Sequence, residues 1–225
     1  MKKVLMEVYQ KLFETFGPRR WWPGETPFEV MVGAILTQNT SWRNVEKAIE
    51  KLKAKGVLTP EGIRRLKKPE LEELIRSSGF YRLKAERLKR FVDFLFDTFG
   101  GEIEKMRTTD LEELRKKLLQ VDGIGPETCD SILLYGLNKP IFVVDAYTKR
   151  ILSRHGVVEE KASYDEVQRL FMEHLPADEK LFNEYHALFV RLAKTYCLKK
   201  PNCTSCPLRT LKVKGGRLEA RKEAL

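Results

Sequence analysis

Leu111–Asp145, the stretch LEELRKKLLQVDGIGPETCDSILLYGLNKPIFVVD, decides the fold that we expect for this chain. It predicts a helix, a tight glycine turn, a second helix, a short extended apolar run and one carboxylate. Thr109 can cap the first helix, and Glu112 three residues later completes a capping box. Gly123 and Gly125 then allow backbone angles that residues with a Cβ atom avoid. The stretch therefore predicts a helical hairpin followed by an acidic side chain.

The turn between the two helices is a candidate phosphate site. Pro126 suits the first position of the second helix, because a missing N–H costs nothing there. The turn leaves several N–H groups free around the glycines, at the positive end of that helix, and this favours a phosphate oxygen. The alternative is an ordinary helical hairpin in which glycine only marks the turn.

The apolar run Ile141–Val144 ends at Asp145, and a helix is expected directly afterwards, at Ala146–Arg154. Asp145 could be only the N-cap of that helix, which is the usual role of an Asp at such a position. A carboxylate delivered from an apolar run is also a candidate for perturbed chemistry. The residues alone leave both interpretations open.

Two segments, VDGIGPETCDSILLYG and VVDAYTKRIL, resemble the helix-hairpin-helix DNA glycosylases of the endonuclease III superfamily. Further matches are FEVMVGAILTQNTSWRNV (Phe28–Val45) and SSGFYRLKAERL (Ser77–Leu88), so the resemblance covers nearly the whole chain. It implies that Asp145 is catalytic and that the hairpin grips the DNA backbone. The residues that it places in contact with DNA at the hairpin are Gly123, Ile124, Gly125 and Thr128.

The composition favours a polyanionic partner without identifying it. The chain has 42 Lys and Arg residues against 32 Asp and Glu residues, which gives a formal net charge of +10. Its isoelectric point is near 9.4. Such a balance suits binding to nucleic acid. A charged fraction of 33% also suggests a thermophilic source, in which the charge would partly be a solvated surface.

The chain is expected to be cytoplasmic and associated with the nucleoid. No apolar run approaches the ~20 residues that a membrane-spanning helix needs. The N-terminal segment MKKVLMEVYQKLFE has acidic residues inside its apolar part, and it lacks the core of a signal peptide. In this compartment the four cysteines should not form disulfides. We expect a monomer that does not bind membranes.

Helical signals dominate the chain, and no segment shows the period-two alternation of a half-buried strand, so the fold class is all-α. The resemblance implies two helical domains with an active cleft between them. The first would comprise residues 25–136 and carry the hairpin. The second would combine residues 1–24 with residues 137–225, including a C-terminal cysteine loop.

All three tryptophans lie early in the chain, at Trp21, Trp22 and Trp42. Core packing is one explanation, and it is favoured for at least one of them. Trp21 and Trp22 cannot share one helix face, however, and indole faces stack on bases and attract cations. The Trp-Trp-Pro run and the aromatic after Thr-Gln-Asn-Thr resemble the bacterial 3-methyladenine glycosylase branch. In that branch the corresponding aromatics line the base pocket.

Gln38 and Glu127 are two further positions at which the resemblance implies a role. In the family, the Gln at the place of Gln38 enters the gap left by the extruded base; the alternative is a loop residue that caps its neighbours. Bifunctional members carry a Lys at the place of Glu127, and its amine forms a Schiff base with the sugar. A carboxylate cannot do so, which predicts a monofunctional enzyme. Glu127 could also favour a cationic base in the pocket.

The C-terminal segment Cys197–Leu208 resembles the iron–sulfur loop of the superfamily, with one cysteine fewer. Cys197, Cys203 and Cys206 are present, but the expected fourth position is Lys212. A four-iron cluster normally takes four thiolates, and the chemistry itself should require no cofactor. The alternatives are a cluster with a substitute ligand, zinc held by three Cys and one His, or a loop without metal, which is the one we expect.

The sequence predicts a monofunctional DNA glycosylase that hydrolyses the N-glycosidic bond of a damaged, alkylated purine in double-stranded DNA, in base excision repair. A glycosylase for an oxidised or mispaired base is the first alternative. The second is a non-enzymatic helix-hairpin-helix module that only binds DNA, in which Asp145 would be merely a cap.

Overall fold

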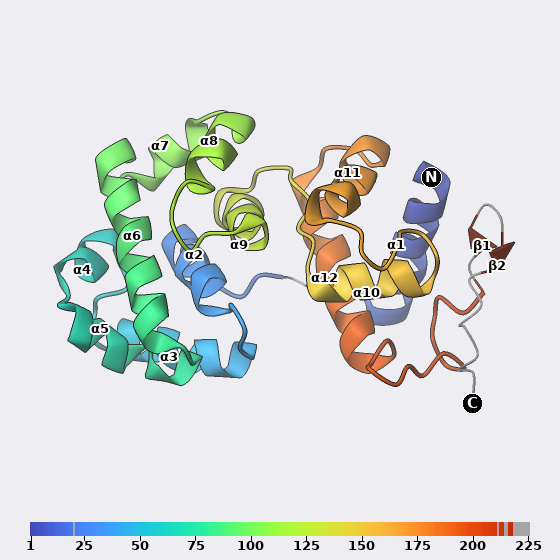
Figure 1. Ribbon diagram of the computed structural model, residues 1–225, viewed down its shortest axis with the longest axis horizontal. Helices are drawn as coiled ribbons and strands as arrows, with labels where there is room; N and C mark the ends of the chain where they lie inside the picture. The colour runs from blue at the N-terminus through green and yellow to red at the C-terminus, as the bar shows by residue number, and fades with distance from the viewer. Residues whose placement is uncertain (20, 211, 214–215, 218–225) are drawn as a thin grey trace. The chain divides into compact units, whose positions relative to one another are not determined.

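The computed structural model describes residues 1–19, 21–210, 212–213 and 216–217 of the chain (Figure 1). The chain divides into two compact units. The hairpin unit is the continuous segment Trp22–Lys139. The terminal unit joins Met1–Trp21 to Pro140–Leu225, so it is built from both ends of the chain.

The hairpin unit consists of helices that are connected by short turns. Most of them are short, and the longest is α6. The elements are α2 (Pro27–Leu36), α3 (Trp42–Ala54), α4 (Pro60–Arg65), α5 (Lys68–Leu74), the 3₁₀ turn η1 (Arg76–Ser78), α6 (Tyr81–Phe99), α7 (Ile103–Thr108), α8 (Leu111–Leu118), α9 (Pro126–Ser131) and the π turn η2 (Ile132–Gly136).

Helix α2 forms the centre of the hairpin unit. Every residue from Phe28 to Leu36 is buried, as expected for a helix that is apolar on all sides. Thr26 caps the helix by accepting a hydrogen bond from the Glu29 amide at 3.1 Å. At the other end, the buried Lys84 ammonium of α6 donates to the Leu36 carbonyl at 2.8 Å. This lysine fixes the point at which α2 ends and the loop to Gln38 begins.

The terminal unit contains four helices and one short strand pair among its described residues. These are α1 (Lys2–Phe16), α10 (Ala146–Arg154), α11 (Tyr164–His174), α12 (Glu179–Thr195), β1 (Lys212–Val213) and β2 (Gly216–Arg217). Its core is aromatic: the rings of Phe142 and Phe171 are stacked with their centroids 3.7 Å apart. The buried Tyr185 hydroxyl donates to the Leu5 carbonyl at 2.8 Å, which joins α12 to α1.

The prediction of an all-α fold is confirmed, since β1 and β2 pair over only two residues each. One local prediction was wrong. The residue that caps α8 is Asp110, whose carboxylate accepts from the Glu112 and Glu113 amides. The Thr109 hydroxyl instead donates to the Lys105 carbonyl of the preceding helix. Thr109 and Asp110 are both good caps by residue type, so the sequence placed the helix start one residue early.

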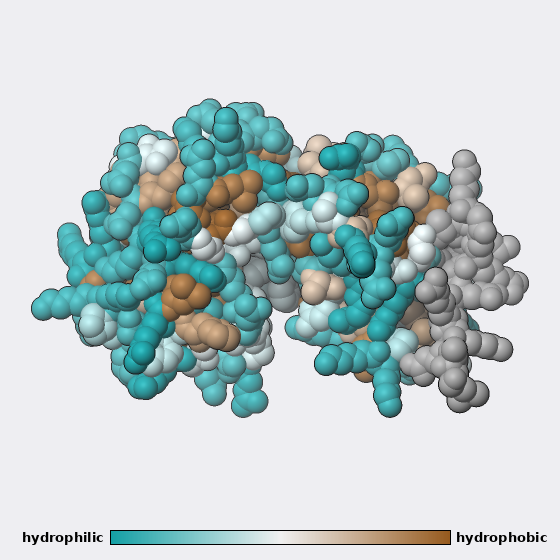
Figure 2. All heavy atoms as spheres, viewed as in Figure 1, coloured by the Kyte–Doolittle hydropathy of each residue, from teal (hydrophilic) through white to brown (hydrophobic). Residues whose placement is uncertain are grey.

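The face drawn in Figure 2 is mostly hydrophilic, and apolar side chains show on it only in scattered patches. This agrees with the charged fraction of the sequence, which is 33%. Within the described part of the chain, no helix has both the length and the apolar character needed to cross a lipid bilayer.

Candidate DNA-contact surface and active-site carboxylate

The glycine turn between α8 and α9 has two glycines with different structural roles. Gly123 has φ +91°, which disfavours any residue with a Cβ atom. Gly125 has φ −87° and ψ 176°, an extended conformation open to most residues, so the expectation of unusual backbone angles there was wrong. A Cβ atom on Gly125 would meet no atom within 4 Å. Gly125 therefore leaves open space outside the turn.

The turn uses one of its three amides within the protein and leaves the two glycine amides for other partners. Ile124 is buried and donates its amide to the Val121 carbonyl at 3.0 Å. No hydrogen bond of the Gly123 or Gly125 amide occurs within the described part of the chain. The side chain of Ile124 cannot reach DNA from its buried position, so only the backbone of this turn is placed to bind a phosphate.

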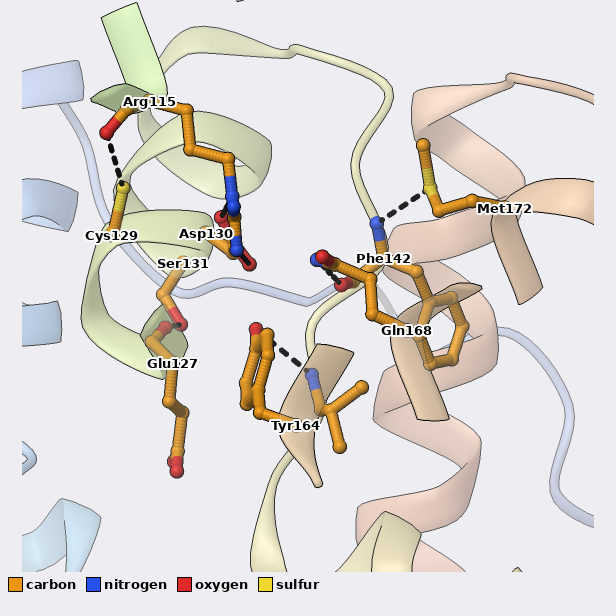
Figure 3. Close-up of polar contacts among 10 residues, drawn as sticks. Arg115, Glu127, Cys129, Asp130, Ser131, Phe142, Tyr164, Gln168 and Met172 are labelled. Carbon is orange, nitrogen blue, oxygen red and sulfur yellow. Dashed lines mark hydrogen bonds and ion pairs between the residues drawn. The ribbon is translucent and has the colours of Figure 1, made fainter. Parts of the chain in front are cut away.

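A buried ion pair holds the two helices of the hairpin together. Arg115 of α8 binds Asp130 of α9 with two parallel contacts, Nε to Oδ1 at 2.8 Å and Nη2 to Oδ2 at 3.2 Å (Figure 3). Asp130 is fully buried, so the two-pronged geometry matters for its desolvated charge. The pair fixes the angle at which the glycine turn is presented.

Gln38 lies against the hairpin. Its Nε2 atom donates to the Gly123 carbonyl at 3.0 Å and to the Thr128 hydroxyl at 2.8 Å. Its Oε1 atom accepts a hydrogen bond from Nη1 of Arg87 in α6. The structure thus brings together three of the expected DNA-contact residues, Gln38, Gly123 and Thr128.

Trp22 and Trp42 form an aromatic cluster with Tyr135. The Trp22 ring meets the Trp42 ring edge to face, with centroids 5.1 Å apart, and it lies 5.1 Å from the Tyr135 ring. Both indoles lie against Gly33 of α2. The two tryptophans are half-buried, so the cluster is more open than a core. Trp21, predicted for the same pocket, belongs to the terminal unit.

Glu127 is exposed in the first turn of α9. Its backbone carbonyl accepts from the Ser131 hydroxyl at 2.7 Å, and its carboxylate points away from the helix (Figure 3). A carboxylate at this place is also favourable for the positive end of the helix.

The extended run before Asp145 pairs with side chains rather than with a sheet. The Phe142 amide donates to the Met172 sulfur at 3.4 Å, and its carbonyl accepts from Gln168 Nε2 at 2.7 Å (Figure 3). The Val144 amide donates to the Tyr164 hydroxyl at 3.3 Å. All three partners come from α11. Because buried backbone groups need partners, α11 fixes the course of the run and hence the position of Asp145.

Asp145 caps α10 and also faces a histidine. Its Oδ1 atom accepts from the Thr148 amide at 2.6 Å, so the N-cap interpretation is correct. Its Oδ2 atom lies 3.5 Å from Nε2 of His186 in α12. Burial acts to raise the pKa of Asp145, but the attraction of His186 and the Thr148 hydrogen bonds outweigh it and hold the pKa below its ordinary value. Asp145 is therefore a partly buried carboxylate that stays charged at neutral pH.

Comparison with known families identifies the chain. The HhH-GPD superfamily, described as base excision DNA repair proteins, matches residues 32–177. The chain belongs to this superfamily. Its DNA glycosylase members are enzymes, and the expectation drawn from the sequence resemblance is confirmed.

Three proteins illustrate the relationship. "Putative DNA repair glycosylase MJ1434" of Methanocaldococcus jannaschii is 48% identical over 209 residues, which cover 92% of this chain and 94% of that protein. The Helicobacter pylori 3-methyladenine DNA glycosylase MagIII, bound to 1,N6-ethenoadenine, is 28% identical with a TM-score of 0.72 over 86% of this chain and 96% of that chain. A trapped endonuclease III–DNA covalent intermediate is 25% identical with a TM-score of 0.80 over 94% and 95%.

The cysteine loop of this HhH-GPD chain is held by two arginines of α10. Arg150 Nε donates to the Cys197 carbonyl at 3.0 Å. Arg154 Nη1 lies 3.4 Å from the Cys197 sulfur, and its Nη2 donates to the Lys199 carbonyl at 2.9 Å. Cys197, Cys203 and Cys206 line one open cavity of about 1900 Å³ beside these arginines.

The residues present do not fit a cluster held by four thiolates. The fourth cysteine of the chain, Cys129, lies in the hairpin unit, where burial raises the pKa of its thiol. The expected fourth position is Lys212, whose ammonium has no lone pair for a metal. Among the residues that the structure describes, no three Cys, His, Asp or Glu side chains converge as metal ligands.

Four residues near these positions were not singled out from the sequence. His186 and Arg87 contact Asp145 and Gln38 from other helices, and Tyr135 completes the aromatic cluster. Phe80 is 68% exposed and has φ +45°, an uncommon angle for an aromatic residue. Only Phe80 carried a local signal, since it follows Gly79 at the start of α6; the others depend on contacts between distant segments.

Proposed function

We propose that this HhH-GPD chain is a monofunctional DNA glycosylase that hydrolyses the N-glycosidic bond of an alkylated purine, such as 3-methyladenine, in double-stranded DNA. The observation that carries the proposal is the cluster that the half-buried Trp22 and Trp42 form with the buried Tyr135 in the hairpin unit. The similarity to MagIII, a 3-methyladenine glycosylase solved with an ethenoadenine, supports the same substrate class.

Aromatic faces suit this substrate because alkylation at a ring nitrogen makes the purine cationic. Extruding a base from the duplex costs a few kcal/mol, and less when the base is damaged. Stacking on aromatic side chains returns about 1–3 kcal/mol per base, and a cationic base adds a cation–π attraction. Neutral bases lack this last contribution, so the cluster would favour the alkylated purine.

Asp145 supplies the charge that the reaction needs. Loss of a cationic purine leaves a positively charged sugar in the transition state, and a nearby carboxylate stabilises it or activates the attacking water. The low pKa of Asp145 keeps the carboxylate ionised over the physiological range. The leaving base is already activated, so the residues of this chain suffice for hydrolysis without a metal or an organic cofactor.

Glu127 supports hydrolysis without strand cleavage. A bifunctional enzyme needs an amine that forms a Schiff base with the sugar, and the position after the hairpin carries an exposed carboxylate instead. The product would be an intact strand with an abasic site. Sodium borohydride should therefore trap no covalent adduct between the protein and abasic DNA.

The hairpin and the net charge supply the grip on DNA. The amides around Gly125 can bind phosphate oxygens, which fix the register of the protein on the duplex. Gln38 and the exposed Phe80 are side chains of the same unit that can fill the space of an extruded base. A net charge of +10 adds electrostatic attraction to the DNA phosphates that does not depend on the DNA sequence.

The deciding experiment is a set of duplexes that each carry one lesion, incubated with the protein and analysed with and without alkali. We expect release of 3-methyladenine or a related alkylated purine, and strand breaks only after alkali. Release of an oxidised pyrimidine or a mispaired thymine alone would contradict the substrate. Strand breaks without alkali would contradict monofunctional action.

The role of the aromatic cluster is tested by Trp42→Ala beside Trp42→Phe. If the indole stacks on the base, single-turnover excision by the alanine variant falls by more than its change in melting temperature explains, and Phe restores part of it. If Trp42 is only core, excision per folded molecule stays at the wild-type value in both variants.

An endonuclease III-like glycosylase for an oxidised base is the second candidate. The observation that favours it is the TM-score of 0.80 to the endonuclease III–DNA intermediate, against 0.72 for MagIII. The same set of lesions separates the two, because the oxidised pyrimidine and the alkylated purine are different substrates in it.

A further inference from the structure

Arg87 of α6 occupies a distinctive place on the hairpin. Its side chain lies so close to Gly123 that a Cβ atom on this glycine would overlap it. Its Nη1 donates to Oε1 of Gln38. Gly123 is therefore needed for the approach of Arg87 as well as for the positive φ of the turn. The guanidinium, the glycine turn and the Gln38 amide form one contact group, which we call the latch.

The charge of Arg87 is not balanced within the protein. No carboxylate forms an ion pair with it in the described part of the chain. Its Nε atom is buried and has no hydrogen-bond partner there, and an unmade bond of this kind is costly. Its charged neighbour is a cation, because Arg87 contributes to the lowering of the Lys84 pKa, to about 8, after burial. Arg87 thus has a charge without an ion-pair partner among the described residues and an unused donor, while the neighbouring carboxylate of Asp122 lies 3.7 Å from Arg90.

Gln38, in contrast, has its polar atoms satisfied by the latch. Its amide nitrogen donates twice, to the Gly123 carbonyl and the Thr128 hydroxyl, and its oxygen accepts from Arg87. A side chain held by three hydrogen bonds is not free to enter DNA. Something must compete for these bonds before Gln38 can move.

We propose that Arg87 binds a phosphate of the DNA backbone at the glycine turn, and that this exchange releases Gln38 from the latch. The proposal rests on the proposed function, because it assumes that Gln38 enters the gap in the duplex. A phosphate oxygen is a stronger acceptor for a guanidinium than a neutral amide oxygen. If the guanidinium turns toward the phosphate in this exchange, its Nε donor, which is buried and without a partner before binding, gains an acceptor as well.

The exchange would couple the binding of the DNA backbone at the turn to the release of Gln38. Backbone binding at the turn removes the charged donor from Oε1 of Gln38 and leaves only the two bonds of its Nε2. Before DNA binds, Gln38 stays folded against the hairpin. After binding, two hydrogen bonds hold it instead of three, so it leaves the hairpin more readily to probe the base stack.

The first test measures affinity for an undamaged duplex as a function of salt. Arg87→Met keeps the apolar stem on Gly123 and removes the guanidinium. We expect binding about tenfold weaker at low salt, and a salt slope smaller by about 0.9, the value for one lost phosphate contact. Lys55→Met is the matched control, because Lys55 is an exposed cation of the same unit that pairs with Glu70. Its slope should equal that of the wild type.

The second test follows insertion into the duplex. The probe is 2-aminopurine beside a tetrahydrofuran abasic analogue, whose fluorescence rises when a side chain disrupts stacking. Gln38→Ala identifies the part of the signal that Gln38 causes. At saturating protein and low salt, we expect Arg87→Met to insert several-fold faster than the wild type, because it does not need the exchange of Arg87 from Gln38 to phosphate before Gln38 moves. If Arg87 merely positions Gln38 for entry, insertion becomes slower.

The proposal is overturned if the salt slope of Arg87→Met is unchanged, or if its insertion rate equals or falls below that of the wild type. A missing Gln38 signal in the wild type overturns it too. Melting temperatures establish that each variant is folded. None of these measurements requires base excision, so failure of the latch is distinguishable from failure of the glycosylase assignment, which the lesion set tests.

Discussion

The glycine turn of the hairpin unit and the extended run before Asp145 are held in opposite ways. The turn keeps the amides of Gly123 and Gly125 without protein partners in the described part of the chain, and it is fixed from beneath by a buried ion pair. The run has its backbone bound by side chains of α11, and it ends in a carboxylate that two further groups contact.

Under the function that we propose, this difference separates DNA binding from chemistry. A surface that must accept a phosphate needs unused donors, so the rigidity of the turn comes from Arg115 and Asp130 behind it. A carboxylate that acts on a sugar cation, as we propose for Asp145, needs a fixed position and a fixed protonation state, and Thr148 and His186 hold it in place. Substitutions at the two places should therefore fail in different ways.

The largest effect is expected for Asp145→Asn. Asparagine keeps the shape and can still accept the Thr148 hydrogen bond, but it removes the charge. Excision should fall by about 10²–10⁴-fold, while affinity for lesion duplex remains close to that of the wild type. The variant should stay folded, with a somewhat lower melting temperature because the charge interactions of Asp145 are lost. Single-turnover kinetics and a binding assay on the same preparation check this. Wild-type excision by the variant would exclude Asp145 from the chemistry.

Asp130→Ala should break the support of the turn. It leaves Arg115 as a partly buried charge without its carboxylate, a change that typically costs about 3–5 kcal/mol of stability. We expect a large drop in the free energy of unfolding, measured with denaturant. The double variant Arg115→Met/Asp130→Ala should recover part of the loss, because no unpaired charge remains. A double variant that is no more stable than Asp130→Ala would show that the charge is not the cause.

Gly125→Val tests the open side of the turn. The conformation of Gly125 suits valine and no atom lies within 4 Å of a Cβ there, so the fold should be unchanged. The added methyl groups should block a phosphate and weaken binding to all duplexes by about tenfold. Gly123→Val is the contrasting variant, since its positive φ and the overlap with Arg87 predict lost stability. Unchanged affinity in a folded Gly125→Val protein would make the hairpin purely structural.

The smallest effect is a displaced pH dependence in His186→Gln. Glutamine keeps a donor toward Asp145 but cannot supply the electrostatic attraction by which His186 lowers the pKa of Asp145, so burial is opposed less and this pKa rises. Because Asp145 must be ionised, the acid limb of the excision rate should move to higher pH, with the rate at neutral pH nearly preserved. An acid limb at the same pH as in the wild type would contradict the role of His186.

The pH dependence of the free energy of unfolding should also change in His186→Gln. A carboxylate whose pKa is lower in the folded than in the unfolded state stabilises the fold above its unfolded pKa. That contribution is lost as the pH falls through the folded value. In His186→Gln the folded pKa lies closer to the unfolded value, so this contribution should be smaller and fully lost at a higher pH than in the wild type.

The sequence predicted the order of the helices and the place of Asp145 well, because both leave local signals. An apolar run that ends in Asp is visible in five residues. It left open an N-cap and a carboxylate with perturbed chemistry, and the structure confirms the N-cap. The start of α8 was displaced by one residue because Thr109 and Asp110 have similar capping ability. These signals need no knowledge of distant contacts.

Other features could not be predicted because their causes lie far apart in the chain. Gln38 meets its partners Gly123 and Thr128 across 85 and 90 residues. The sequence predicted an unusual backbone conformation at Gly125, but this glycine is extended and leaves open space beside the turn. A glycine in a sequence does not show which of these two features it provides. Trp21 and Trp22 are adjacent in the sequence but fall in different units, which no local pattern reveals.

The division of the chain has a consequence for its synthesis. The hairpin unit, Trp22–Lys139, is one continuous segment and can fold while the ribosome is still making the rest. The terminal unit cannot, because the bond between Tyr185 and Leu5 spans 180 residues. Helix α1 therefore cannot pack against α12 until α12 has left the ribosome. Until then its apolar face of Leu5, Val8 and Leu12 stays uncovered. During that interval α1 is the segment that a chaperone would need to protect.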